Sequence, residues 1–159
     1  MKLEKIKINT PLGVVKINGN AEGIHSVIFS NKKSPVSKEI PKVLQECVQQ
    51  LEEYFEGTRK EFTVKLNPQG TEFQRKAWKS LQTIPYGKTM SYSEQSNILN
   101  KPKAIRAVAN ANGKNLLAIL VPCHRIIGSD GSLTGYAWGL ERKDWLLNHE
   151  SNIKQQSLF

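Results

Sequence analysis

The sequence predicts a mixed α/β (α+β) fold in two parts, and three observations point to it. Over residues 3–30, apolar groups recur between turn signals, which is typical of a short antiparallel sheet. Later segments carry apolar residues at helical spacing. The polar stretch Asn67–Gly70 has the composition of a linker. We therefore expect a small α/β domain with a structural role at residues 1–68 and a mainly helical domain at residues 69–159.

The first domain begins with strands that are separated by turns at Pro11–Gly13 and Gly19-Asn20. A helix is expected at Glu39–Glu56, because apolar residues recur there at the spacing of one helix face. Gly57 can end this helix, since glycine adopts the left-handed conformation of a helix C-terminus without strain. Alternating apolar residues over 62–66 predict one more strand.

Three kinds of element frame the second domain. A helix is expected at Thr71–Ile84, where apolar residues share one face and Pro85 follows. The apolar run Leu116–Val121 predicts a buried strand. A glycine-rich loop over residues 128–139 then leads to a last helix at Leu140–Glu150.

Between these elements, two short helices predict a helix-turn-helix. Ser91 followed by Glu94 is the signature of a capping box, which starts a helix over Tyr92–Leu99. Asn100 can stop that helix. The second helix is expected at Pro102–Asn112, because proline suits the first helical turn.

The net charge of +9 on the 159 residues is concentrated in one region. Residues 75–125 hold nine Lys or Arg and a single acid, Glu94, so nine minus one gives +8 for that stretch alone. A concentrated basic region favours a polyanionic partner such as nucleic acid. A solvated basic surface without such a partner would have the same composition.

Several classes of protein are disfavoured. No apolar run approaches the ~20 residues of a membrane span, and Met1–Lys5 lacks the start of a secretory signal. We therefore expect a cytoplasmic monomer without a membrane partner. Two cysteines, three histidines and the absence of a Cys-x-x-Cys pair predict no metal site. The chain has no phosphate-binding or dinucleotide motif, so no cofactor is expected.

The most informative segment is Val121–Ile127, in which Cys123 and His124 are adjacent. Pro122 fixes its own φ and restricts the residue before it, so Cys123 is presented in one defined orientation. A thiol beside an imidazole can become a nucleophilic thiolate. A buried structural cysteine is the alternative, but it would leave Pro122 and His124 without a purpose.

This segment is part of a longer match. Asn115–Ile127, followed by Tyr136–Leu140 and Trp145–Glu150, resembles the methylated-DNA–protein-cysteine methyltransferases, the O6-alkylguanine-DNA alkyltransferase family. The motifs agree in order and spacing from about Thr71 to Glu150, whereas the region before Thr71 agrees only in length and coarse pattern. The resemblance implies repair of double-stranded DNA that contains O6-alkylguanine, chiefly O6-methylguanine. The base is flipped out, and its alkyl group is transferred irreversibly to Cys123, once per molecule.

The resemblance also implies the catalytic residues. Cys123 is the nucleophile, and His124 accepts its proton through a bend or a bridging water, because adjacent side chains of an extended chain point to opposite faces. Glu150 fixes the tautomer of His124, and Asn115 braces the active-site turn. Tyr92 presses on the backbone of the flipped nucleotide and can donate a proton to guanine N3.

Substrate contacts follow from the same resemblance. Arg106 takes the place of the flipped base in the stack, and the remaining contacts are mainly to phosphate. The expected DNA-binding residues are Arg106, Tyr92, Lys101, Lys103, Lys114 and Arg125. The expected pocket residues are Val121, Tyr136, Ala137 and Trp138. Trp138 stands where some members of the family carry glycine, so it should leave little room for bulky benzyl-type adducts.

Three other functions remain open from the sequence. Alkyltransferase-like proteins bind alkylated DNA without enzymatic activity, but they carry another residue, commonly tryptophan, at the position of Cys123. A cysteine hydrolase could also use Cys123 and His124, although the basic helix pair would then be idle. A transcription regulator could use the helix-turn-helix on an undamaged sequence.

Overall fold

The computed structural model describes residues 2–32, 35–36 and 39–151 and confirms the mixed α/β fold. The chain divides into two compact units. The first takes residues up to Gln69 together with Leu116–Leu120, and the second takes Gly70–Asn115 and the residues from Val121 onward. Leu116–Leu120, which lead toward Cys123, therefore belong to the first unit, and the chain enters the second unit at Val121. None of the helices in the described ranges is long and apolar enough to cross a membrane.

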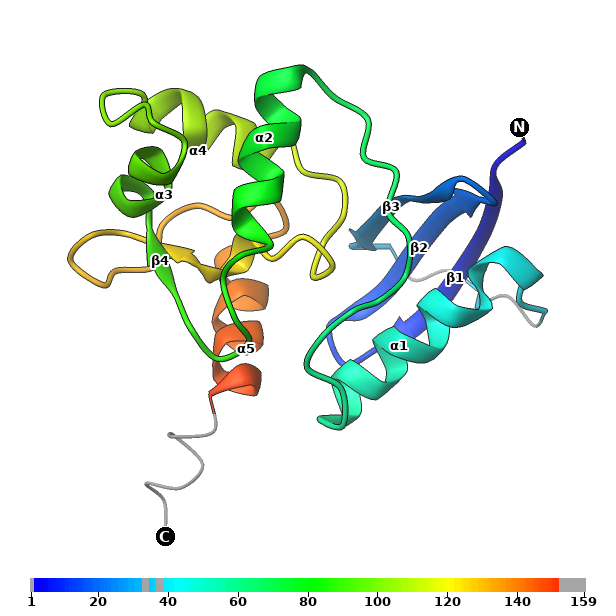
Figure 1. Ribbon diagram of the computed structural model, residues 1–159. Helices are drawn as coiled ribbons and strands as arrows, with labels where there is room; N and C mark the ends of the chain where they lie inside the picture. Colours follow the sequence, from blue (N-terminus) through cyan, green and yellow to red (C-terminus); the bar gives the residue numbers. More distant parts are fainter. Residues whose placement is uncertain (1, 33–34, 37–38, 152–159) are drawn as a thin grey trace, which may run out of the picture. The chain divides into compact units, whose positions relative to one another are not determined.

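The first unit is built on an antiparallel sheet in the order β1-β2-β3 (Figure 1). Its strands are β1 Glu4–Thr10, β2 Gly13–Asn20 and β3 Gly23–Ser30, which confirms the three strands expected from the turn signals. Ile6 pairs with Ile17, and Ile17 pairs with Val27, so three branched side chains lie side by side across the sheet. All three are at most 2% exposed and form the core of this face.

One helix, α1 Gln45–Glu56, packs against this sheet (Figure 1). It begins six residues later than expected, because Pro41 disfavours a helical conformation at Ile40, and residues 42–44 form only a short 3₁₀ turn. Gly57 ends the helix in the left-handed conformation, with a φ of 87°. Cys47 lies on the buried face of α1.

The strand expected over residues 62–66 does not form. Only Leu66 pairs with the sheet, through a single bridge to Ile24. The reason lies in the helix side chain of Gln50, whose Oε1 accepts from the Thr63 amide at 3.0 Å while its Nε2 donates to the Thr63 hydroxyl at 2.7 Å. A side chain of α1 thus satisfies the backbone that a neighbouring strand would otherwise pair with.

The second unit is mainly helical, and its helices start and stop where local signals allow. Its elements are α2 Glu72–Leu81, β4 Met90–Ser91, α3 Tyr92–Ile98, α4 Ile105–Gly113, η2 Cys123–Arg125, β5 Ile126–Ile127 and α5 Leu140–Glu150. The capping box of Ser91 and Glu94 starts α3, and Asn100 follows it with a φ of 58°. The second helix of the pair begins at Ile105 rather than at Pro102, because the Ala104 amide bonds to the Lys101 carbonyl and closes a turn first.

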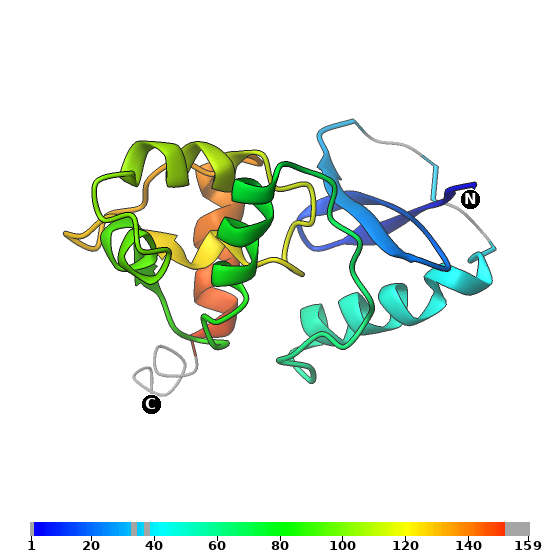
Figure 2. The same cartoon turned by 45° about the horizontal axis from the view of Figure 1, so that its top comes forward.

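Buried polar contacts fix how α3 and α4 pack. Gln95 is fully buried and exchanges two hydrogen bonds with Asn112, at 3.0 and 2.8 Å. The indole of Trp78 on α2 donates to the Ala111 carbonyl at 2.8 Å. Figure 2 shows α2 beside α4, with which it packs. These directional bonds set the geometry of the helix-turn-helix more narrowly than apolar packing could.

Candidate active site around Cys123

Two tight turns, and not the expected strand, lead to Cys123. The Leu120 amide bonds to the Ala118 carbonyl at 2.8 Å, with Ile119 between them at a φ of 72°, which is a γ-turn. The expectation of a strand over 116–121 is therefore wrong except for one bridge at Leu117. Such a turn is strained, at ~1–3 kcal/mol for a residue other than glycine. Ile119 is only 2% exposed, so packing holds it there.

The second turn contains Pro122. The Cys123 amide bonds to the Val121 carbonyl at 2.8 Å, and Pro122 has φ −81° and ψ 63°, the values of an inverse γ-turn. Proline is suited to this turn because its ring already fixes φ near that value. Cys123 then opens the 3₁₀ turn η2, which continues through His124 and Arg125. The thiol is thus presented at a bend of the chain.

Burial keeps the thiol protonated in the free protein. Cys123 is 7% exposed, and burial raises the pKa of its thiol to about 11. Two neighbours oppose that rise: the Asn115 amide, which donates to Sγ at 3.4 Å, and the positive charge of Lys143. Asn115 also donates to the Val121 carbonyl at 3.0 Å, so one side chain ties the thiol to the turn before it.

His124 and Glu150 form a buried pair. His124 Nε2 lies 2.7 Å from Glu150 Oε2, and the two residues are 0% and 2% exposed. Burial lowers the pKa of His124, so the ring is neutral near pH 7. Because Glu150 can only accept when ionised, the ring proton is assigned to Nε2. The other ring nitrogen, Nδ1, is buried and has no hydrogen-bond partner among the described residues, so it can act as a base.

Arg125 corrects an expectation from the sequence. It is 7% exposed, and its guanidinium donates to both oxygens of Glu150, at 2.8 and 3.1 Å, and to the Ile84 carbonyl at 2.7 Å. A guanidinium held inside the protein in this way is not available to phosphate, so the expected DNA contact of Arg125 is wrong. Its place in the sequence beside Cys123 and His124 gave no sign of this inward orientation.

The Glu150 carboxylate is therefore held by two neighbours. Burial alone would raise its pKa, but the hydrogen bonds from His124 and Arg125, together with the positive charge of Arg125, outweigh burial and lower the pKa to about 2. Glu150 is the last residue of α5, and η2 carries both of its partners. The carboxylate thus fastens the cysteine turn to the last helix.

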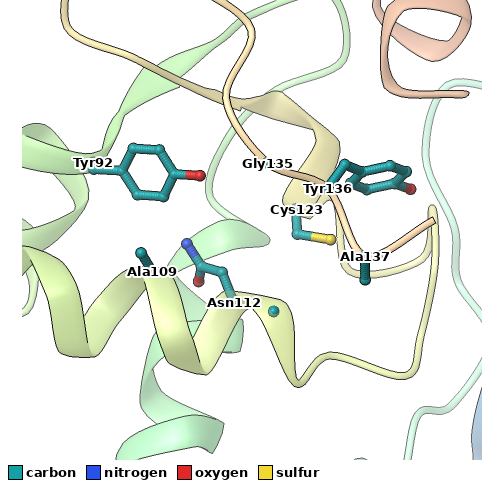
Figure 3. Close-up of a pocket in the computed structure, with 8 residues that line it drawn as sticks. Tyr92, Ala109, Asn112, Cys123, Gly135, Tyr136 and Ala137 are labelled. Carbon is teal, nitrogen blue, oxygen red and sulfur yellow. The ribbon is translucent and has the colours of Figure 1, made fainter. Parts of the chain in front are cut away.

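A cavity of about 350 Å³ opens at the thiol, toward the lower end of the ~300–1,000 Å³ typical of small-molecule sites. Figure 3 shows Tyr92 entering from one side, with Cys123 across the cavity from it. The lining residues are Tyr92, Ala109, Asn112, Gly113, Cys123, Gly135, Tyr136 and Ala137. Tyr136 and Ala137 were expected there, whereas the contributions of α4 and Gly135 were not.

Two expected pocket residues do not line the cavity. Val121 is 2% exposed, and its carbonyl already accepts from the Cys123 amide and from Asn115. Its two lone pairs are thus in use, so this carbonyl has none left for a ligand in the cavity. The Trp138 ring packs edge-on against Tyr136, with ring centroids 5.4 Å apart. Trp138 can therefore influence the cavity through Tyr136.

Lys143 is the site residue that sequence reasoning missed. Its side chain is fully buried, and its ammonium donates to the carbonyls of Thr134 at 2.7 Å and Gly135 at 3.4 Å. Burial lowers the pKa of Lys143 to about 8. The helical spacing gave a signal for this burial. Lys143 lies three positions before Leu146 and seven before Glu150, so it shares their face of the helix.

Four exposed basic residues that were expected to bind DNA lie on and beside α4. Arg106 is an exposed residue of α4, and Lys101, Lys103 and Lys114 are exposed just before and just after it. Arg106 is three positions before Ala109, which lines the cavity, and so lies on the same side of the helix. One stripe of α4 thus carries both an exposed arginine and part of the cavity wall.

The fold and the site together define a class: a helix-turn-helix protein with a buried cysteine at a cavity that the second helix also lines. Two family models match the chain. The ribonuclease-like domain of 6-O-methylguanine DNA methyltransferase matches residues 3–68, and the DNA binding domain of 6-O-methylguanine DNA methyltransferase matches residues 72–152. The chain therefore belongs to the 6-O-methylguanine DNA methyltransferase family, and the resemblance inferred from the sequence is confirmed.

Individual relatives agree over nearly the whole chain. The methylated-DNA–protein-cysteine methyltransferase of Methanosarcina barkeri is 45% identical, over 91% of this chain and 95% of that protein. The crystal structure of the O6-methylguanine methyltransferase of Mycobacterium tuberculosis is 40% identical, with a TM-score of 0.84 over 94% of this chain and 93% of the other. The structure of OGT from the same organism in complex with DNA is 42% identical, with a TM-score of 0.83 over 91% of this chain and 90% of the other.

Proposed function

We propose that the protein repairs O6-alkylguanine, chiefly O6-methylguanine, in double-stranded DNA by transferring the alkyl group to its own Cys123. The observation that carries the proposal is the position of the Cys123 thiol at a cavity that α4 also lines. A base extruded beside α4 would enter that cavity. In the reaction a bond forms between sulfur and the alkyl carbon while the bond between that carbon and guanine O6 breaks.

The thiol needs a base before it can attack. With a pKa of about 11 in the free protein, only about one thiol in 10⁴ is ionised near pH 7. His124 can take the proton at Nδ1, through a bridging water, because no hydrogen bond joins this nitrogen to other described residues. Glu150 accepts from the opposite ring nitrogen at 2.7 Å and stabilises the imidazolium that forms.

The leaving guanine also needs a proton. Tyr92 lines the cavity with its hydroxyl pointing inward (Figure 3), so it can donate to guanine N3 as the bond to O6 breaks. Protonation at this nitrogen lets the base leave as neutral guanine. The sulfur product is a thioether, which neither water nor another thiol readily breaks. Each molecule therefore acts once.

In this proposal, basic side chains bind the DNA phosphates, and α4 displaces the damaged base from the stack. Arg106 fills the space that the extruded base leaves, and Lys101, Lys103 and Lys114 neutralise phosphates. Flipping costs a few kcal/mol and costs less for a badly paired base, so an alkylated guanine is favoured without reading of the sequence. The binding should accordingly weaken as the salt concentration rises.

The first unit has a supporting role in this proposal. Its strand β3 bridges to Leu117, with bonds from the Val27 amide to Leu116 at 2.8 Å and from the Ala118 amide to Val27 at 3.0 Å. These bonds fix the start of the segment that leads to Cys123. We expect the reaction to take place in the cytoplasm, where thiols stay reduced, and both Cys47 and Cys123 are free.

The test is a mass measurement on the intact protein. After incubation with duplex DNA carrying one O6-methylguanine, the protein should gain one methylene per molecule. Cys123→Ser should gain nothing, whereas Cys47→Ser, which removes a buried thiol away from the cavity, should gain the methylene as the wild type does. A complex with the damaged DNA without any mass gain would instead indicate an alkyltransferase-like damage-binding protein.

A further inference from the structure

A hydroxyl outside the cavity lining makes contact with the tyrosine that lines it. Thr134 Oγ1 lies 3.2 Å from the hydroxyl oxygen of Tyr92, in a bond between residues that are 42 positions apart. Thr134 belongs to the loop before α5, and Tyr92 opens α3. The contact therefore joins this loop, three residues of which line the cavity, to the first helix of the helix-turn-helix.

We propose that Thr134 is a positioning residue that orients the phenolic proton of Tyr92 for the transfer to guanine N3. The inference rests on the function proposed above, because it assumes that Tyr92 protonates the leaving base. Thr134 is not among the residues that line the cavity. It acts through Tyr92 alone.

The proposed role of Tyr92 requires that Thr134 is the donor of this hydrogen bond. Each hydroxyl has one proton to donate and lone pairs to accept with. If Tyr92 gave its proton to Thr134, none would be left to face the cavity. With Thr134 as the donor, the phenolic oxygen accepts on one side and its own proton is free to point toward the substrate.

Thr134 is well placed to act as a fixed donor. Its carbonyl accepts from the buried ammonium of Lys143 at 2.7 Å, so α5 holds its backbone. Its side chain is branched at Cβ, which restricts the rotation that carries Oγ1. The neighbouring Gly135 lines the cavity and accepts from the same ammonium at 3.4 Å. The hydroxyl donor is thus fixed at its backbone before any DNA binds.

The bond should matter most during the reaction. As the proton leaves Tyr92 for guanine N3, negative charge builds on the phenolic oxygen, and hydrogen bonds to charged oxygen are stronger than those to neutral oxygen. Thr134 then stabilises the transition state more than the bound complex. Loss of the hydroxyl should lower the rate of methyl transfer about 10-fold, with little change in the affinity for DNA.

The test uses single-turnover methyl transfer from duplex DNA with one O6-methylguanine, measured by rapid quench. Thr134→Val keeps the shape but removes the hydroxyl and should be slowed about 10-fold, whereas Thr134→Ser keeps the hydroxyl and should remain close to the wild-type rate. In the Tyr92→Phe background, Thr134→Val should cause no further loss. Ser132→Ala, which removes a hydrogen bond to Asp130 in the same loop, is the matched control and should leave the rate unchanged.

A second substrate separates positioning from a purely structural role. In 3-deaza-O6-methylguanine a carbon replaces N3, so the phenolic proton has no acceptor on the base. On this substrate Thr134→Val and the wild type should react equally fast. An equal slowing of Thr134→Val on both substrates would overturn the inference. So would an equal slowing by Thr134→Val in the wild-type and Tyr92→Phe backgrounds. A wild-type rate for Thr134→Val on the natural lesion would overturn it as well. In all of these outcomes the wild type still gains its methyl group, whereas failure of the proposed function would leave the wild type itself unmodified.

Discussion

Replacement of Glu150 by glutamine tests how the active-site turn is held together. The carboxylate takes hydrogen bonds from His124 and from two nitrogens of Arg125, and both carboxylate and guanidinium are buried. Glu150→Gln has almost the same shape but no charge, so the guanidinium would remain inside the protein without its counter-ion. Breaking a buried pair in this way typically costs about 3–5 kcal/mol.

The low pKa of Glu150 leads to the same expectation. It falls from the ordinary value of 4.5 to about 2, which corresponds to about 3 kcal/mol of stability. Because the folded-state pKa is the lower one, this stability is present above pH 4.5 and is lost as the pH falls toward 2. The difference between the wild type and Glu150→Gln should therefore shrink across that range of pH.

Urea unfolding followed by tryptophan fluorescence measures the effect, since Trp78, Trp138 and Trp145 all lie in the second unit. The matched control is Glu141→Gln, an exposed acid on the same helix, which should change the unfolding free energy by less than about 0.5 kcal/mol. A loss of less than about 1 kcal/mol for Glu150→Gln at pH 7 would contradict the expectation that an unpaired guanidinium is costly inside the protein.

Three further changes test other parts of the site. Arg106→Ala should slow repair of duplex DNA at least ~10-fold more than the reaction with free O6-methylguanine base, because only the duplex must be opened; equal slowing in the two rate assays would remove the role in flipping. Trp138→Gly should speed the reaction with free O6-benzylguanine by freeing Tyr136 to move, and equal rates for the variant and the wild type would remove the steric argument. Methylated protein should melt several degrees lower than the free form, because a methyl group on Cys123 crowds the Asn115 amide 3.4 Å away, at a cost of about 1–3 kcal/mol; calorimetry showing an unchanged or higher melting temperature would contradict this.

Helix ends, turns and strands that depend on neighbouring residues could be predicted from the sequence. The capping box at Ser91 and Glu94, the left-handed Gly57 and the left-handed Asn100 each depend on a few neighbouring residues, and each lies where it was expected. The three strands of the sheet follow in the same way from turns that are short and close in sequence. Local chemistry is sufficient for such features.

Elements that depend on distant partners could not be predicted. The apolar run before Cys123 has the composition of a strand, but the γ-turn at Ile119 bends it, and only tertiary packing can hold a branched residue in that conformation. Within residues 62–66, the Thr63 amide bonds to the side chain of Gln50 on α1 and not to a neighbouring strand. In both cases the apolar pattern does not reveal where the backbone hydrogen bonds go.

The site shows the same division. Cys123, His124 and Glu150 could be proposed from motifs, and the structure brings the latter two together at 2.7 Å. The inward orientation of Arg125 and the buried position of Lys143 depend on carbonyls and carboxylates far away in sequence. Arg125 was expected at the DNA, but neither its charge nor its place beside Cys123 reveals which way its side chain points.

The central claim is that the Cys123 sulfur takes the alkyl group of a flipped guanine. The most direct measurement locates the label after reaction with duplex DNA that carries an isotopically labelled methyl group on guanine O6. Peptide mapping by mass spectrometry should find one labelled methyl per protein molecule, on the peptide that contains Cys123 and on no other. An unlabelled Cys123 after prolonged exposure to excess damaged duplex, or a label on Cys47 instead, would contradict the account.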